Sequence, residues 1–280
     1  MRQIDGRSGL GSEAVRGRVT PALSRVPEIT LIFWVIKVLT TGMGEATSDY
    51  LVHAIPPPVA VLLGAVALTG ALWLQFRAGR YVPWTYWLAV VMVAVFGTMA
   101  ADTLHVGLHV PYAASTLLFA VSLAIVFVLW RRSEGTLSIH SIVTRRREVF
   151  YWATVMATFA LGTAAGDFSA RTLGLGWLGS CVFFAGVMAI PLVGWWRFSM
   201  NPILAFWFAY IVTRPLGASI ADWLGLPPSL GGVGLGRGVV SLSLTALIAL
   251  LVGYLTIRER TSPAQRPGLA TGESVGETPG

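Results

Sequence analysis

The feature of this chain that most limits its fold is a spacing of residue types that occurs four times. In each copy an aspartate follows a small residue directly, a glycine by five positions and a tryptophan by fifteen. The aspartates are Asp49, Asp102, Asp167 and Asp222; the glycines are Gly44, Gly97, Gly162 and Gly217; the tryptophans are Trp34, Trp87, Trp152 and Trp207. Because the chain has only 11 tryptophans, four matches in one register indicate an internal repeat.

Long apolar runs accompany every copy of this spacing. Hydrophobic residues make up 55% of the chain and charged residues 12%, which is typical of membrane spans and unlike a water-soluble globule. The sequence therefore predicts an all-α integral membrane protein with eight transmembrane helices in four tandem two-helix repeats. The expected spans, each close to the ~20 residues that cross a bilayer, are residues 29–50, 57–76, 84–106, 112–130, 149–170, 175–195, 202–223 and 238–257.

The division of the chain follows from these spans. The eight-helix domain is expected over residues 28–258, with repeats at about 28–77, 81–131, 148–197 and 201–258. Residues 1–27 form a basic N-terminal tail, and residues 259–280 are rich in Pro, Gly, Thr and Ser, which predicts a disordered C-terminal tail. Cys181 lies inside an apolar run and is read as a small buried hydrophobic residue.

The distribution of Lys and Arg predicts the orientation. Sixteen of the 20 cations lie in the two tails or in the loops that follow even-numbered spans. By the positive-inside rule these segments face the cytoplasm, so we expect a multi-pass protein of the inner membrane with both termini cytoplasmic. Because each unit crosses twice, all four aspartates are then expected on the extracytoplasmic side.

The segments around the aspartates resemble a known family. They read KVLTTGMGEATSDYL, FGTMAADTL, LGTAAGDFSA and RPLGASIADWL. In these segments and in its spacing, the chain resembles, over about residues 28–258, a bacterial membrane-protein family with four tandem copies of a two-helix "repeat of unknown function". The resemblance implies the architecture and carries no activity.

The repeated glycines predict helix packing. Each stands four residues before a small residue, as Gly44 does before Ser48 and Gly162 before Gly166. Small residues spaced in this way leave a groove in which a second helix backbone can approach closely.

The first span carries the most polar sequence pattern. Lys37, Thr41, Glu45, Asp49 and His53 recur every four residues, so a helix would place them in one stripe from its inner half to its outer end. Such a stripe fits a water-lined path for a cation, and it equally fits a salt-bridge network that holds helices together. We therefore take Lys37, Thr41, Glu45 and Asp49, with the other aspartates and Arg214, as candidates for an ion pathway.

Two of the four units differ from the others in the middle of their first span. Units one and four have a helix-disrupting residue seven positions before the aspartate, Gly42 and Pro215, and each has an intramembrane cation, Lys37 or Arg214. These features predict broken helices in spans one and seven and a substrate site between them. In the alternative, Arg214 only pairs with Asp222.

Three histidines near the expected outer surface suggest a metal site. His53 follows Asp49 by four residues, and His105 follows Asp102 by three and precedes His109 by four. Carboxylate and imidazole groups on one helix face suit a divalent transition ion, although no closed zinc motif is present.

Together these patterns favour a secondary transporter or channel for a cation, with a divalent metal among the candidates, or for a proton-coupled small solute. The alternative is a non-transporting membrane scaffold or sensor whose polar residues only pack helices. No nucleophile and base pair stands out, so neither an enzyme nor a resident cofactor such as haem is expected. The expected partners are the lipid bilayer and a small inorganic ion or solute, without nucleic acid, and a homo-oligomer is left open.

Overall fold

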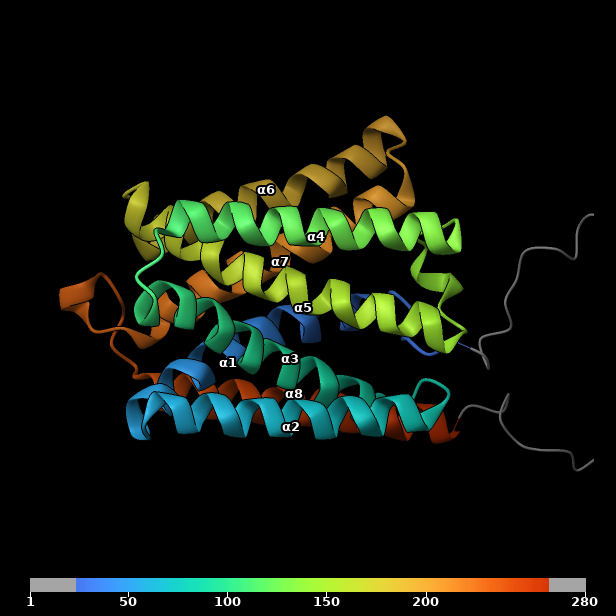
Figure 1. Ribbon diagram of the computed structural model, residues 1–280, viewed down its shortest axis with the longest axis horizontal. Coiled ribbons are helices and arrows are strands. Elements are labelled where there is room, and N and C mark those ends of the chain that lie inside the picture. The colour runs from blue at the N-terminus through green and yellow to red at the C-terminus, as the bar shows by residue number, and fades with distance from the viewer. Residues whose placement is uncertain (1–23, 262–280) are drawn as a thin grey trace, which may run out of the picture.

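Eight long α-helices and a few short turns of helix make up the described part of the chain. A computed structural model describes residues 24–261, and no strand occurs among them (Figure 1). The long helices are α1 (Leu31–Ala54), α2 (Pro57–Ala78), α3 (Pro83–Asp102), α4 (Tyr112–Glu134), α5 (Arg145–Asp167), α6 (Gly176–Phe198), α7 (Pro202–Gly225) and α8 (Arg237–Thr261). The short elements are the π turns η2 (Thr103–Gly107) and η4 (Phe168–Thr172) and the 3₁₀ turns η3 (Ile139–Ser141) and η5 (Pro228–Leu230).

Local sequence signals set the helix ends. The side chains of Thr30, Thr144 and Asn201 accept hydrogen bonds from backbone N–H groups in the first turns of α1, α5 and α7. These N-caps satisfy donors that a helix start leaves without partners. Gly79 and Gly135 end α2 and α4 in the left-handed conformation that glycine adopts without strain.

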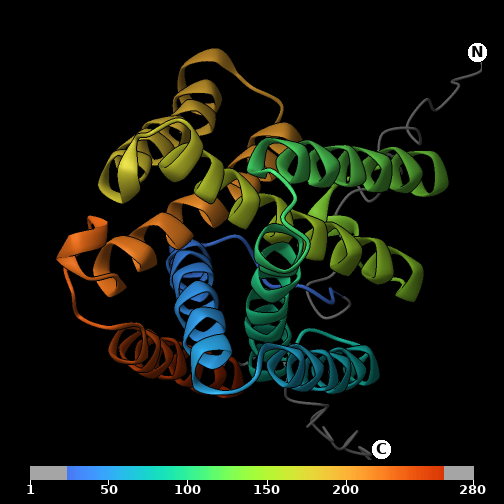
Figure 2. The same cartoon turned by 60° about the vertical axis from the view of Figure 1, so that its left-hand side comes forward.

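The odd-numbered helices form the inside of the bundle. Helix α1 packs on α3, α3 on α5, α5 on α7, and α7 on α1, so these four helices make a closed ring, called here the inner ring. Helices α2, α4, α6 and α8 lie outside it, at the corners of the bundle in Figure 2. Their outward leucines, such as Leu62, Leu118 and Leu242, are more than half exposed. The outer surface of the bundle is therefore strongly apolar.

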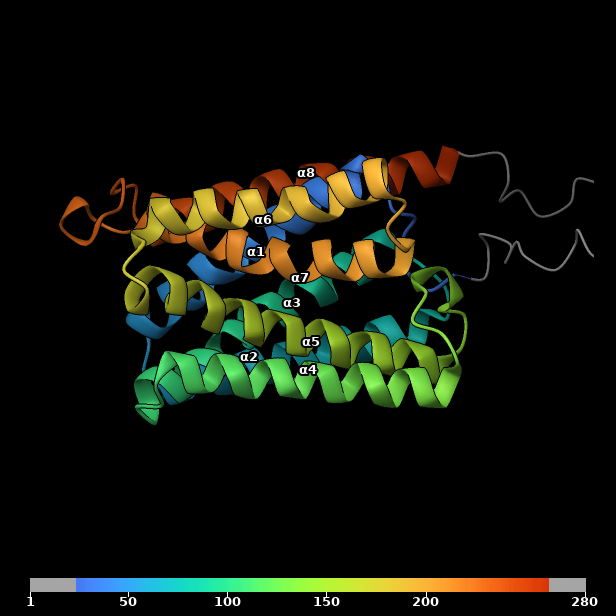
Figure 3. The ribbon, with the colours of Figure 1, turned by 90° about the horizontal axis from the view of Figure 1, so that it is seen from above.

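Each outer helix packs mainly on the first helix of the following unit. Helix α2 packs on α3, α4 on α5 and α6 on α7, while α8 returns to pack on α1 (Figures 2 and 3). The second helix of a sequence repeat thus covers its neighbour in the ring. This arrangement links all four units in a circle that α8 closes.

The two ends of the bundle differ in which segments meet there. Helix α1 begins and α8 ends at the same end, called here the terminal end (Figure 1). The connections from each odd helix to the next even helix lie at the opposite end, called here the aspartate end, because each aspartate stands near the end of its odd helix.

The four repeated glycines lie at the contacts between neighbouring inner helices. A β-carbon at each glycine would collide with the residue that stands eight positions before the aspartate of the next unit. The pairs are Gly44 with Ala94, Gly97 with Phe159, Gly162 with Arg214 and Gly217 with Thr41. The last pair closes the circle between units four and one. Only glycine leaves room for the approach of these helices.

An aromatic belt surrounds the terminal half of the inner ring. It consists of the four repeated tryptophans and the aromatic residue directly before each one, and each preceding ring contacts the tryptophan of the neighbouring unit. Ring centroids are 5.7 Å apart for Phe33 and Trp87, 5.6 Å for Tyr86 and Trp152, 6.3 Å for Tyr151 and Trp207, and 5.8 Å for Phe206 and Trp34. The belt closes in the same circular order as the glycine contacts.

The prediction of eight helices is confirmed for the described residues. Helices α2 to α8 are long and apolar enough to cross a membrane, whereas the charged residues of α1, including Lys37 and Glu45, lower its hydropathy. The predicted tails 1–27 and 259–280 lie largely outside the described residues, as do Arg2, Arg7, Arg16, Arg18 and Arg266. Cys181 is buried and free, as expected.

The prediction that spans one and seven are broken is wrong. Helices α1 and α7 are continuous, and Pro215 lies inside α7 without ending it. Gly42 serves a different purpose, because a β-carbon there would lie 3.1 Å from the carbonyl oxygen of Gly217. This glycine permits close approach of α1 and α7, and its helical backbone is uninterrupted.

Candidate functional site

Acidic side chains from three inner helices meet at the aspartate end. Carboxylate oxygens of Glu45, Asp49 and Asp102 lie within 4.8 Å of one another, and so do ligand atoms of Asp102, His105 and Asp167. We call these five residues the acid cluster. Asp102 belongs to both groups and joins them into one chain of acidic side chains. Asp222, at the equivalent position of α7, belongs to neither group.

Three arginines neutralise part of this charge. Arg237 pairs with Asp49 at 2.9 Å, and Arg171 pairs with Asp167 at 3.1 Å. Arg214 pairs with Glu45. Among the described residues, Asp102 and Asp222 have no ion pair within 4.0 Å. Five carboxyl groups therefore share three arginines, and among the described residues those of Asp102 and Asp222 have no arginine within ion-pair distance.

The deepest member of the acid cluster is held by a buried ion pair. Nη2 of Arg214 donates to Oε2 of Glu45 at 2.9 Å, and Nη1 donates to the carbonyl oxygen of Thr41 at 2.7 Å. Nη2 also contacts the hydroxyls of Thr98 and Thr163. Arg214 has no exposed surface. Residues from all four inner helices thus hold this central ion pair. In the described structure Arg214 pairs with Glu45 and not with Asp222, the alternative partner.

Lys37 lies next to the central ion pair without an acidic partner. Its Nζ is buried, lacks a hydrogen-bond partner and stands 4.0 Å from the ring centroids of both Phe159 and Tyr210. The guanidinium of Arg214 lies 5.0 Å from the same Phe159 ring. The lysine amine is therefore covered by aromatic faces, and in the described structure it forms no ion pair with Glu45, which pairs with Arg214.

The polar stripe of α1 extends across these layers. Lys37, Thr41 and Glu45 are buried, Asp49 is partly buried and His53 is exposed. From the aspartate end inward, the inner ring contains the acid cluster, the central ion pair, Lys37 and then the aromatic belt. Charged groups thus lie at the aspartate end and in the middle of the inner ring, and packed aromatic rings fill its terminal half.

Only one of the three candidate metal-binding histidines enters the acid cluster. His105 is buried in η2, where its ring contacts Tyr112. His53 is exposed, and its Nε2 lies 3.4 Å from Arg237. His109 is exposed and has a positive φ of 55°. The structure does not bring the three imidazoles together.

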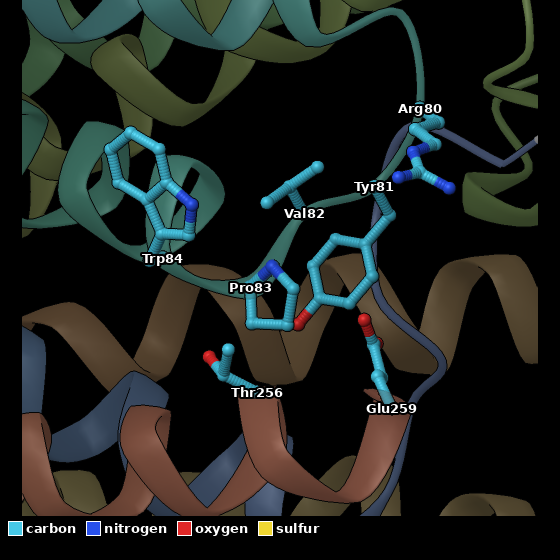
Figure 4. A pocket seen from close by; sticks show the side chains of 7 residues that line it. All are labelled: Arg80, Tyr81, Val82, Pro83, Trp84, Thr256 and Glu259. Atoms are coloured by element: carbon cyan, nitrogen blue, oxygen red, sulfur yellow. The ribbon is translucent and has the colours of Figure 1, made fainter. Parts of the chain in front are cut away.

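A pocket at the opposite end of the bundle is separate from these groups. It is lined by Arg80, Tyr81, Val82, Pro83, Trp84, Thr256 and Glu259, where the segment before α3 meets the end of α8 (Figure 4). Burial raises the pKa of the Tyr81 phenol above its ordinary value, and the Glu259 carboxylate raises it further. This pocket contains none of the candidate pathway residues.

Several residues of the site were not predicted from the sequence. Arg171 and Arg237 are two of the four cations outside the tails and the loops that follow even-numbered spans, and both pair with repeated aspartates. Ser115, whose hydroxyl oxygen lies 2.6 Å from Nε2 of His105, was not among the predicted site residues. An aromatic residue stands directly before each repeated tryptophan, so the sequence does contain this part of the pattern.

Comparison with known proteins identifies the repeat. The family model described as Repeat of Unknown Function (DUF347) matches residues 32–81, 85–136, 150–201 and 205–261. These four matches follow one another without overlap and agree with the four predicted units. No curated protein and no solved structure matches the chain.

Proposed function

We propose that this chain, which belongs to the Repeat of Unknown Function (DUF347) family, is a secondary transporter or channel for cations whose path follows the axis of the inner ring. The carrying observation is the acid cluster, where five carboxyl and imidazole groups from α1, α3, η2 and α5 converge. The excess of carboxylates supports cation entry, because a cation or proton relieves the repulsion between them.

The proposal includes an orientation in the inner membrane. All eight long helices cross the bilayer, the outer leucines face lipid, and the terminal end faces the cytoplasm. The arginines that follow α2, α4 and α6 support this orientation. At the aspartate end, the described cations Arg171 and Arg237 are both paired with aspartates. Helix α1 tolerates its charges because α3, α7 and α8 cover it.

In this proposal the central ion pair blocks the path. Glu45 accepts from Arg214, so an entering cation competes with the guanidinium for the same carboxylate oxygen. Beyond it, the amine of Lys37 packs between two aromatic rings, and the aromatic belt fills the terminal half. Passage therefore requires Arg214 to release Glu45, which makes transport a step between two arrangements of charges.

Flux measurements test this function. Purified protein in proteoliposomes should carry at least one ion from a panel of monovalent and divalent cations, with a pH dye inside to detect proton coupling. Asp102→Asn should reduce the flux at least tenfold, because Asp102 links the two groups of the acid cluster. Asp102 has no ion pair in the described structure, so this variant should still fold.

Glu28→Gln is the matched control, because this exposed acid lies at the terminal end just before α1. Its flux should equal that of the unaltered protein. Absence of flux for every cation, or equal flux from Asp102→Asn and Glu28→Gln, would favour the scaffold or sensor.

Labelling of single cysteines tests the orientation. In a Cys181→Ala background, Val233→Cys at the aspartate end should react with an impermeant reagent in intact cells. His140→Cys, between α4 and α5, should react only after lysis. Both positions are exposed. Reaction of His140→Cys in intact cells would contradict the proposed orientation.

A further inference from the structure

The geometry around His105 points to a specific ligand. We propose that Asp102, His105 and Asp167 bind a divalent transition-metal ion at the mouth of the inner ring, and that this ion is the transported cation. The proposal rests on the function proposed above and names its substrate class. Two independent observations carry it: the convergence of the three ligand atoms within 4.8 Å, and a buried imidazole nitrogen without a partner.

The hydrogen bonds of Ser115 favour one tautomer of His105. The Ser115 hydroxyl donates to backbone carbonyl oxygens of its own helix turn, at 3.0 Å for Tyr112 and 3.3 Å for Pro111. Nε2 of His105 lies 2.6 Å from Oγ of Ser115. As part of this proposal, Nε2 donates and Oγ accepts, because the hydroxyl proton is directed at the carbonyl oxygens. This assignment places the proton of the neutral ring on Nε2. A hydrogen bond on the second nitrogen is the usual way in which proteins fix a metal-binding histidine.

The other ring nitrogen has its lone pair free and faces a carboxylate. His105 is 7% exposed, and its Nδ1 has no hydrogen-bond partner among the residues that the structure describes. This atom lies 3.8 Å from Oδ2 of Asp167. A lone pair and a carboxylate oxygen repel each other unless a positive charge lies between them. A metal ion bound to both atoms removes this repulsion and supplies the missing partner.

The two aspartates complete the set of ligands. Arg171 occupies Oδ1 of Asp167 at 3.1 Å and leaves Oδ2 to face His105. Asp102 has no ion pair among the described residues, so its carboxylate is available. The set has two carboxylates and one neutral imidazole. Mixed oxygen and nitrogen ligands suit ions such as Mn²⁺, Co²⁺ or Zn²⁺ better than Mg²⁺ or Ca²⁺, which prefer oxygen alone.

The backbone at this position departs from a regular α-helix. The π turn η2 follows Asp102 directly and contains His105, and η4 follows Asp167 in the same way. Such π turns are frequent at functional sites. The other three units have Val52, Ala170 and Gly225 where unit two has His105. The imidazole is therefore a departure from the repeat.

The shared ligand provides a route inward. Asp102 also belongs to the group with Glu45 and Asp49. An ion that leaves His105 can keep Asp102 while it gains these two carboxylates. At that point it reaches the partner of Arg214. The metal site is thus continuous with the central ion pair.

Metal binding by the purified full-length protein in detergent tests this inference without measuring transport. Mn²⁺ is the probe, and its free concentration is followed by electron paramagnetic resonance. His105→Ala should weaken Mn²⁺ binding by more than about 100-fold, the upper range for losing an outer-shell partner. Ser115→Ala should weaken it by about 10-fold, because the ring loses the bond that fixes its tautomer. Bound Mn²⁺ should show nitrogen hyperfine coupling that His105→Ala removes.

Two variants are matched controls. Ser180 stands thirteen residues after Asp167, as Ser115 does after Asp102, but it bonds Ser169 and no histidine. His53 is an exposed imidazole at the same end. Ser180→Ala and His53→Ala should bind Mn²⁺ as the unaltered protein does.

Unchanged Mn²⁺ affinity in His105→Ala would overturn the metal site and would identify His105 and Asp167 as a simple proton-linked pair. That result would leave the proposed transport intact if Asp102→Asn still abolished flux of another cation. Conversely, tight Mn²⁺ binding through His105 without flux of any ion would support the site and contradict the transport function.

Discussion

The four units are alike in the terminal half of the inner ring and differ from one another towards the aspartate end. In the terminal half, all four units contribute an aromatic pair, and every pair contacts the next in the same way. Towards the aspartate end, equivalent positions diverge. The residues four before the aspartate are Glu45, Thr98, Thr163 and Ala218, and those eight before it are Thr41, Ala94, Phe159 and Arg214. The repeated residues build the ring and place an aspartate at the end of each inner helix, whereas the buried charges deeper in the ring, Glu45 and Arg214, are departures from the repeat.

Electrostatics gives a reason for this division. Four copies of Arg214 or of Glu45 around one buried axis would repel one another strongly in a medium of low dielectric constant. One arginine, one glutamate and two threonines instead form a single set with mutual hydrogen bonds. Aromatic contacts have no such conflict, so they can repeat in all four units.

The largest loss of stability is expected from disrupting the central ion pair, in the half of the inner ring where the four units differ. Glu45→Gln leaves Arg214 buried without a counter-charge and should destabilise the protein by about 3–5 kcal/mol. Adding Arg214→Met should restore most of this loss, because no unpaired charge remains. Thermal unfolding of the single and double variants in one detergent measures both values. A double variant no more stable than Glu45→Gln would mean that the central ion pair is not what the single substitution disrupts.

A smaller but still substantial effect is expected where the two halves meet. Gly162→Ala places a methyl group against the side chain of Arg214 and should cost about 1–3 kcal/mol through overpacking. Gly70→Ala is the control, because no atom lies within 4 Å of its added carbon. Unfolding midpoints of the two variants give the comparison. Equal midpoints would show that the glycine contact is not tight.

The repeated half should respond to the loss of single polar groups only modestly. The hydroxyls of Tyr86 and Tyr151 are 2.5 Å apart in the aromatic belt. Tyr86→Phe should cost about 1 kcal/mol, the net value of one hydrogen bond, and should leave cation flux unchanged. Thermal unfolding and flux are measured on the same preparation. A large loss of flux at unchanged stability would place function in the repeated half and remove the distinction between the halves.

The smallest effect on stability is expected at the rim of the acid cluster. Arg171 is more than half exposed in its pair with Asp167, so Arg171→Gln should change stability by less than about 1 kcal/mol. It should nevertheless strengthen Mn²⁺ binding, because it removes a positive charge beside a proposed ligand. Titration at low and high salt checks this, since screening weakens the effect of an exposed charge. Weaker Mn²⁺ binding in the variant would indicate that Arg171 positions Asp167.

Local patterns were enough to find the elements of this protein. Hydropathy located the eight helices to within a few residues, and the spacing from Trp34 to Asp49 revealed the units before any contact was known. The stripe on α1 was likewise readable from its period of four residues. The prediction that α1 and α7 are broken was wrong, because it considered only the local effects of Gly42 and Pro215 on a helix. Gly42 instead permits a close contact with α7.

The sequence by itself determined helices, repeats and the polar face of α1, because each depends on residues close together along the chain. Only the tertiary structure decided which units touch: α8 packs on α1, and Arg214 reaches Glu45 across 169 positions of sequence. It also decided that His105 faces Asp167, while His53 and His109 lie apart from it. Such pairings depend on how helices pack, and a periodic pattern specifies which face is buried without specifying its partner.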